Sequence, residues 1–154
     1  MFEKESELIE SLSKYSIEIG VISEDTGRKE TISYGITNAE LMQIHENGSP
    51  IKNIPARPVL DLTIMWTEQH LIKRVLDSII EGVFEKNWGK VEIERELSRM
   101  CIRMENHARE IIYDNDGTLA PNSPQVAKRK KGNHPLFDTG QLARSITCKL
   151  RVKN

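Results

Sequence analysis

Residues 91–113 read VEIERELSRMCIRMENHAREIIY, and their apolar side chains recur every three or four positions. This period places them on one face of an α-helix. Residues 60–86 carry a second stripe of the same kind, and Asn87-Trp88-Gly89 breaks the pattern between the two. The sequence therefore predicts an antiparallel helical hairpin over 60–86 and 91–113. The stripe of the second helix consists of Ile93, Leu97, Met100, Cys101, Met104, Ala108, Ile111 and Ile112.

Strands are predicted on either side of this helical hairpin. Apolar residues alternate over 15–21 and again over 32–36, with a turn signal between them, which predicts a β-hairpin over 15–36. Alternation returns near the C-terminus and predicts a strand over 145–153 with one buried face and one basic face. We expect an α+β fold in which this small antiparallel sheet packs against the helices 60–86 and 91–113.

Shorter elements are expected around these. Thr37 and Glu40 have the spacing of a capping box, and Gly48 is a stop signal, so a short helix should lie between them. Three prolines make the segment 49–58 an extended loop. The remaining expectations are a helix over 2–14, a short helix over 38–47, a flexible loop around 114–135 and a helical turn over 139–144.

Length and composition limit the classes of protein to which the chain can belong. The 154 residues are enough for one domain, 1–154, and 38% apolar with 29% charged residues is too balanced for a disordered chain. No apolar run reaches the ~18 residues that span a bilayer, so we expect no membrane contact. The acidic N-terminus argues against a signal peptide, and two cysteines make no disulfide framework, which favours synthesis in a reducing cytoplasm.

The charge is divided unevenly along the chain. Residues 120–154 hold eight Lys and Arg against one acid, a net charge of +7, whereas the preceding 119 residues carry 14 bases and 22 acids, a net charge of −8. Such a chain can attract copies of itself head to tail, place its basic part on nucleic acid, or have an ordinary solvated surface. The basic run Lys128, Arg129, Lys130 and Lys131 leaves the same alternatives open: a solvated loop, a contact with a neighbouring subunit, or a phosphate contact.

One motif suggests catalysis. Asp114-Asn115-Asp116-Gly117-Thr118-Leu119 matches the first signature of the haloacid-dehalogenase-like phosphatases, in which the first Asp is the nucleophile and Mg²⁺ offsets the phosphate charge. That chemistry needs a buried strand in front of the motif, but the preceding stripe is helical. It also needs a parallel sheet and a second acidic motif downstream, for which too little chain follows. We therefore expect a polar turn that ends a helix.

Other chemistry is not indicated by the residue spacing. The four histidines, His45, His70, His107 and His134, lie far apart and have no cysteine companions at metal-ligand spacing. Cys101 and Cys148 each lie on an apolar face, which predicts inert packing residues. We expect no catalytic residue, no metal and no cofactor.

Three stretches resemble a known family when they are taken together. Ile44-His45-Glu46-Asn47-Gly48, Ile54-Pro55-Ala56-Arg57-Pro58 and the run PLFDTGQLARSI at 135–146 occur in this order. They are similar to motifs of the virion-morphogenesis proteins of tailed bacteriophages, the tail-completion or head–tail joining proteins of Mu-like and lambdoid-type phages. The resemblance covers about Leu41 to Val152 and includes the segment 119–124. The chain differs at Val59, where the family usually has Phe.

The resemblance implies a structural, non-enzymatic protein of the phage neck or tail terminus, made in the cytoplasm of the host bacterium and located in the virion. It implies a homo-oligomeric ring of six copies that completes the tail and joins it to the head. The partners would be further copies of the chain, the head connector and the tail tube, with DNA passing through the ring. A small Mg²⁺-dependent phosphohydrolase using Asp114 and Asp116, and a basic-tailed nucleic-acid-binding module, are the alternatives.

Several residues are candidates for subunit or connector contacts. Arg57 stands between two prolines, which makes it a pre-ordered donor for a carboxylate. Asp138 can cap the turn that follows it, and Gly140 allows close approach. The same residues can equally be internal determinants of the fold. The candidate contact residues are His45, Glu46, Arg57, Asp138, Lys149 and Arg151, and the candidates for contact with passing DNA are Lys128, Arg129, Lys130 and Lys131.

Overall fold

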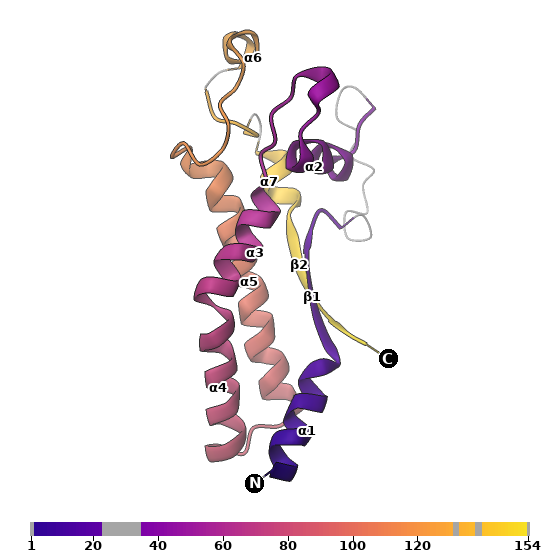
Figure 1. Ribbon diagram of the computed structural model, residues 1–154, viewed down its shortest axis with the longest axis vertical. Coiled ribbons are helices and arrows are strands. Elements are labelled where there is room, and N and C mark those ends of the chain that lie inside the picture. The colour runs from indigo at the N-terminus through magenta and orange to yellow at the C-terminus, as the bar shows by residue number, and fades with distance from the viewer. Residues whose placement is uncertain (1, 23–34, 131–132, 138–139, 154) are drawn as a thin grey trace.

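The computed structural model describes residues 2–22, 35–130, 133–137 and 140–153, and it has the predicted α+β class (Figure 1). Two strands form an antiparallel sheet that packs against the long helices. None of the helices in the described ranges is long and apolar enough to cross a membrane. The helices are α1 (Phe2–Ser13), α2 (Asn38–Asn47), η1 (Pro50–Lys52, a 3-10 helix), α3 (Val59–His70), α4 (Ile72–Glu85), α5 (Lys90–Asp114), α6 (Pro124–Arg129) and α7 (Gln141–Ser145), and the strands are β1 (Tyr15–Gly20) and β2 (Thr147–Val152).

The helical hairpin is confirmed, but its first arm consists of two helices. The predicted helix 60–86 is interrupted at Leu71, where φ is −110°, so α3 ends and α4 begins there. The hydroxyls of Thr63 and Thr67 donate to the carbonyls of Val59 and Thr63, each at 2.8 Å. Such bonds compete with the backbone ladder and bend helices. Both helices lie alongside α5 (Figure 1).

A tight break between α4 and α5 was also predicted, and it is present. The amide of Trp88 donates to the carbonyl of Gly82 at 2.9 Å, and Asn87 takes a left-handed φ of 53°. The ring of Trp88 lies so close to Gly82 that any side chain there would overlap it. This contact closes the hairpin end.

The sheet pairs the two ends of the chain. β1 and β2 are antiparallel, with Tyr15 opposite Val152 and Gly20 opposite Thr147. The second arm of the predicted β-hairpin 15–36 falls mostly on residues 23–34, which lie outside the described residues. Strand β2 lies on α5, where the Glu105 carboxylate accepts from the Cys148 amide at 3.2 Å and Arg109 donates to the Ile146 carbonyl at 3.0 Å.

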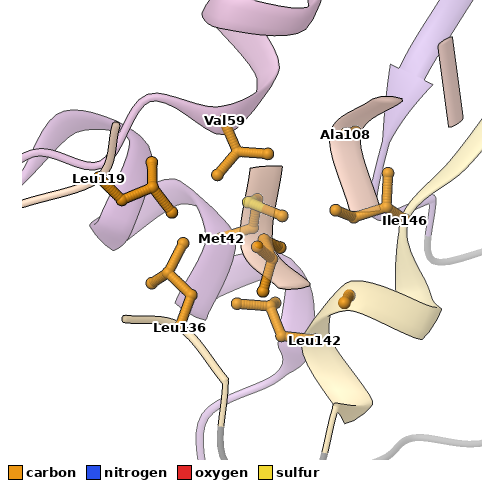
Figure 2. Close-up of a cluster of buried hydrophobic side chains, with 9 residues drawn as sticks. Met42, Val59, Ala108, Leu119, Leu136, Leu142 and Ile146 are labelled. Carbon is orange, nitrogen blue, oxygen red and sulfur yellow. The ribbon is translucent and has the colours of Figure 1, made fainter. Parts of the chain in front are cut away.

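Two apolar clusters hold the structure together, and α5 contributes to both. The first, here called the lower cluster, lies between α1, α4, α5 and the sheet. The second, the upper cluster, joins α2, the start of α3, the end of α5, the chain after α5, and α7 (Figure 2). The lower cluster contains Leu8, Leu71, Val75, Ile79, Ile93, Leu97, Met100 and Met104. The upper cluster contains Met42, Val59, Ala108, Ile112, Leu119, Leu136, Leu142, Ala143 and Ile146.

The short elements match the predictions except in two segments, the first of which is the predicted extended loop 49–58, where η1 makes one 3-10 turn. Thr37 and Glu40 form the expected capping box, with the Thr37 amide donating to the Glu40 carboxylate at 2.8 Å, and Gly48 ends α2 with a φ of 71°. The segment predicted as a loop over 114–135 contains helix α6. Ser123 caps it by accepting from the Val126 amide at 3.4 Å, and Pro124 begins it, where a missing amide proton costs nothing.

Candidate functional site

Arg57 lies at the centre of a buried polar network. Its side chain is 5% exposed, and its Nε and Nη2 donate to the carbonyls of Ala120 at 2.7 Å and Pro121 at 2.8 Å. Its backbone amide donates to the His45 carbonyl at 2.6 Å. Burial lowers the pKa of Arg57 below its ordinary value. The guanidinium therefore ties the segment after α5 to the end of α2, and its use as a carboxylate donor for another subunit stays a prediction.

His45 completes this network. Its Nδ1 lies 3.4 Å from Nη1 of Arg57. Burial, followed by the positive charges of Arg57 and Lys130, lowers the pKa of His45 to about 4. The imidazole is therefore neutral at pH 7, and Nδ1 is the acceptor that suits the guanidinium beside it.

Glu46 is used within the fold as a helix cap. Its carboxylate accepts from the amides of Leu60 at 3.1 Å and Asp61 at 2.8 Å, at the first turn of α3. Pro58, which precedes that helix, provides no side-chain cap. A carboxylate at a helix N-terminus satisfies free amides and offsets the helix dipole. Glu46 thus fixes the angle at which α3 leaves the loop 49–58.

The late motif at 135–146 is described only in part. Asp138 lies outside the described residues, as does Thr139, so the predicted cap is not seen. Gly140 takes a left-handed φ of 75°, and a Cβ there would lie 3.1 Å from the ring of Phe137 and 2.9 Å from the Arg144 guanidinium. The close approach predicted at this glycine is confirmed. The helical turn that follows is α7.

The basic strand face is paired within the chain. Arg151 Nε donates to the Glu18 carboxylate at 3.1 Å, and Lys149 stands opposite Glu18 in the register of the sheet. On the other face, Cys148 and Leu150 pack against the lower cluster, but Val152 is 50% exposed. The predicted division into a buried and a basic face therefore ends at Leu150.

The basic run begins on α6. Lys128 and Arg129 end that helix and are exposed, and Lys130 Nζ donates to the Phe137 carbonyl at 3.3 Å. Lys131 lies outside the described residues. Figure 1 shows α6 beyond the end of the α3–α5 pair.

A hollow that sequence reasoning missed lies between α3 and the end of α5. Its volume is about 310 Å³. The rings of Trp66 and His107 stack against its wall, with centroids 3.9 Å apart and planes inclined by 13°. Burial and the nearby His70 lower the pKa of His107, and Glu110 opposes this. The two rings are 41 positions apart in sequence, so no local spacing could have paired them. The lining residues are Leu62, Met65, Trp66, Gln69, His107, Glu110, Ile111, Asp114, Asp116 and Thr118.

The phosphatase-like motif is at the edge of this hollow. Asp114 is the last residue of α5, and Asn115 follows it with a left-handed φ of 47°. Asp116 accepts from the Thr118 amide at 2.9 Å, and its bonds to the Thr118 hydroxyl and amide lower its pKa. The motif is thus a turn after a helix, as predicted, without the strand that a phosphatase nucleophile needs in front of it. Among the residues that the structure describes, no three His, Cys, Asp or Glu side chains are grouped to hold a metal ion.

The two cysteines are both free thiols. They form a hydrogen bond to each other between α5 and β2, and this bond together with burial raises the pKa of Cys148. A raised pKa keeps the Cys148 thiol protonated and poorly nucleophilic, in line with the predicted packing role.

The three motif stretches converge on one end of the molecule. Residues 44–48 and 54–58 surround Arg57, and residues 135–146 add Leu136, Leu142 and Ile146 to the upper cluster (Figure 2). Val59 is fully buried there. No family model, curated protein or solved structure matches the chain.

Proposed function

We propose that this chain is a non-enzymatic structural protein of the neck or tail terminus of a tailed bacteriophage. It forms a homo-oligomeric ring of six copies that completes the tail and offers a docking face to the head connector. The observation that carries the proposal is the convergence of the three family-like stretches. Although up to about 100 residues separate them, all three contribute to the Arg57 network or the upper cluster.

The division of charge supports the same assembly. A closed ring needs heterologous contacts, in which one patch meets a different patch on the next copy. A body of net charge −8 and a C-terminal quarter of net charge +7 provide two such unlike patches within one chain. Opposite potentials steer the encounter and fix its register. The cations of α6 and of the segment after it can face the channel or the neighbouring subunit.

The size of the purified protein tests this proposal. We expect mass photometry and negative-stain electron microscopy at low salt to show a closed ring of six copies. Because part of the attraction is between exposed charges, about 1 M salt should shift the equilibrium toward smaller species. A protein that stays monomeric at every salt and protein concentration would contradict the proposal.

Two control measurements separate the alternatives. Turnover of an aryl phosphate with Mg²⁺ that disappears in Asp114→Asn would favour the phosphohydrolase. Tight, sequence-selective binding of duplex DNA by the monomer at physiological salt would favour the nucleic-acid-binding module, since non-specific phosphate contacts weaken steeply with salt. We expect neither result.

A further inference from the structure

Three carboxylates gather at the hollow between α3 and α5. Glu110, Asp114 and Asp116 all line it, and its lining contains no Lys or Arg. Asp116 uses one oxygen for the Thr118 amide, and Glu110 lies 3.9 Å from a His107 ring whose pKa is lowered. Within the described parts of the chain, no cation neutralises these acids at contact distance.

The rest of the lining suits the stem and head of a basic side chain. Leu62, Met65 and Ile111 provide apolar surface, and Trp66 with its stacked His107 provides an aromatic face. Lys and Arg lay their methylene stems along apolar surface and place their charged heads against carboxylates. An aromatic face also attracts such a head when it lies within ~6 Å of the ring centre. The hollow thus has the chemistry that recognises an exposed cation.

The chain carries such cations on α6. Lys128 and Arg129 are exposed at its C-terminal end, and neither has a partner in the ranges that the structure describes. They do not line the hollow of their own chain. The hollow belongs to the acidic body and α6 to the basic quarter, so the two are the unlike patches that a heterologous contact requires.

We propose that the hollow bounded by Trp66, Glu110 and Asp114 receives Lys128 and Arg129 of a neighbouring copy. This inference rests on the proposed ring and names the contact that closes it. Each copy then places these two side chains in the next copy's hollow, and the hollow of the first copy receives those of the last. Glu110 and the two acids of the phosphatase-like motif act in this contact as receptors for cations.

Charge reversal on each side of the contact tests the inference. Glu110→Lys with Asp114→Lys in one variant, and Lys128→Glu with Arg129→Glu in another, should each lower the affinity of the subunits by at least about tenfold, because like charges then face each other. Circular dichroism should show that both variants are folded. The matched control is Glu5→Lys with Glu7→Lys, an equal charge change at exposed positions of α1, which should assemble as wild type.

Mixing the two reversed variants gives the sharpest result. In the mixture, the normal cations of the first variant meet the normal hollow of the second, and the reversed arm meets the reversed hollow. An alternating ring should therefore form from two proteins that fail to assemble separately. Trp66→Ala should weaken assembly without a change in charge.

The possible failures are distinguishable. If the wild type forms rings and both reversed variants form them equally well, the hollow is not the contact, and the inference fails while the proposed ring stands. If both variants fail alone and their mixture also fails, the pairing of α6 with the hollow is wrong. If the wild type itself never assembles, the proposed function fails and the inference fails with it.

Discussion

At the scale of single residues, the side chains singled out by the sequence have definite roles inside the fold. Arg57, His45 and Glu46 hold the end of α2, the loop 49–58 and the segment after α5 against one another. The sequence identified Arg57 and its neighbours because prolines and a helix end make them conspicuous. It could not predict their partners, because Ala120 and Pro121 act through backbone carbonyls that any residue would provide.

Removal of the Arg57 guanidinium should destabilise the fold strongly. Arg57→Ala leaves two carbonyls without their donor in a buried site, and we expect a loss of about 3 kcal/mol in the free energy of unfolding. Arg57→Lys keeps the charge but loses the planar fork, so it should lose less. Urea denaturation at pH 7 measures both, and a loss below about 0.5 kcal/mol in the alanine variant would contradict the network.

The lowered pKa of His45 should make stability depend on pH. The pKa of His45 is about 4 in the folded state, whereas it is near 6.5 in the unfolded chain. The contribution of His45 is therefore complete above pH 6.5 and is lost as the pH falls toward 4. Since the ring is only partly buried, we expect a loss of about 2 kcal/mol in the free energy of unfolding, which is less than the whole pKa difference would give.

The substitution His45→Gln isolates this effect from other acid-sensitive groups. The difference in urea midpoint between pH 7 and pH 5 should be smaller in His45→Gln than in wild type. Exposed Gln43 on the same helix offers the control, since Gln43→Ala removes no titratable group and should retain the wild-type difference. Equal pH dependence in His45→Gln and wild type would refute the assignment.

At the scale of elements, the spacing of apolar residues predicted those helices and strands that the local sequence determines. Helices α1 and α5 and strands β1 and β2 lie where their apolar patterns indicate, and α2 lies where its capping box and Gly48 indicate. The break at Leu71 was not predicted because the apolar stripe of 60–86 continues across it. The hydroxyl bonds of Thr63 and Thr67 favour a bend, but they do not interrupt the spacing of the apolar residues. Helix α6 was missed because its six residues have no apolar stripe, although Ser123-Pro124 is a start signal.

The cap that Glu46 provides for α3 gives a prediction at this scale. Glu46→Ala removes the acceptor for two amides of the first turn and should lower the melting temperature, with a loss of about 1–2 kcal/mol. Glu46→Gln keeps one acceptor oxygen without the charge and should lie between the alanine variant and wild type. Glu7→Ala on the exposed side of α1 is the control. If Glu46→Ala and Glu7→Ala have the same melting temperature, the cap contributes nothing to the stability of the fold.

At the scale of the whole molecule, the proposed assembly depends both on the charge division in the sequence and on the surfaces that the folded monomer leaves available. The charge division is visible in the sequence. Which charged side chains can contact a neighbouring copy depends on which of them already form ion pairs within their own chain. Arg151 illustrates this, because Glu18 of the same chain already contacts it. The hollow beside Trp66 could not be predicted, since it is formed by residues from two helices and the turn after α5.

Reversal of the basic strand face should affect the monomer as well as the ring, because Arg151 already contacts Glu18. Lys149→Glu with Arg151→Glu places two new acids beside Glu18, three in all, and we expect a loss of about 1 kcal/mol in monomer stability. Adding Glu18→Lys restores the pairing with opposite signs. If the face is a subunit contact, the triple variant should be as stable as wild type and still fail to assemble by mass photometry. Normal rings from the triple variant would show that this face lies outside the contact.

The proposed role, under which the gene lies in a phage or prophage, is tested most directly by deletion of the gene. Electron microscopy of the induced lysate should show DNA-filled heads and separate tails that are not joined, with infectivity restored by the gene in trans. The Glu110→Lys, Asp114→Lys variant should fail to restore it. Complete, infectious virions in the absence of the gene would contradict the assignment to the head–tail joint.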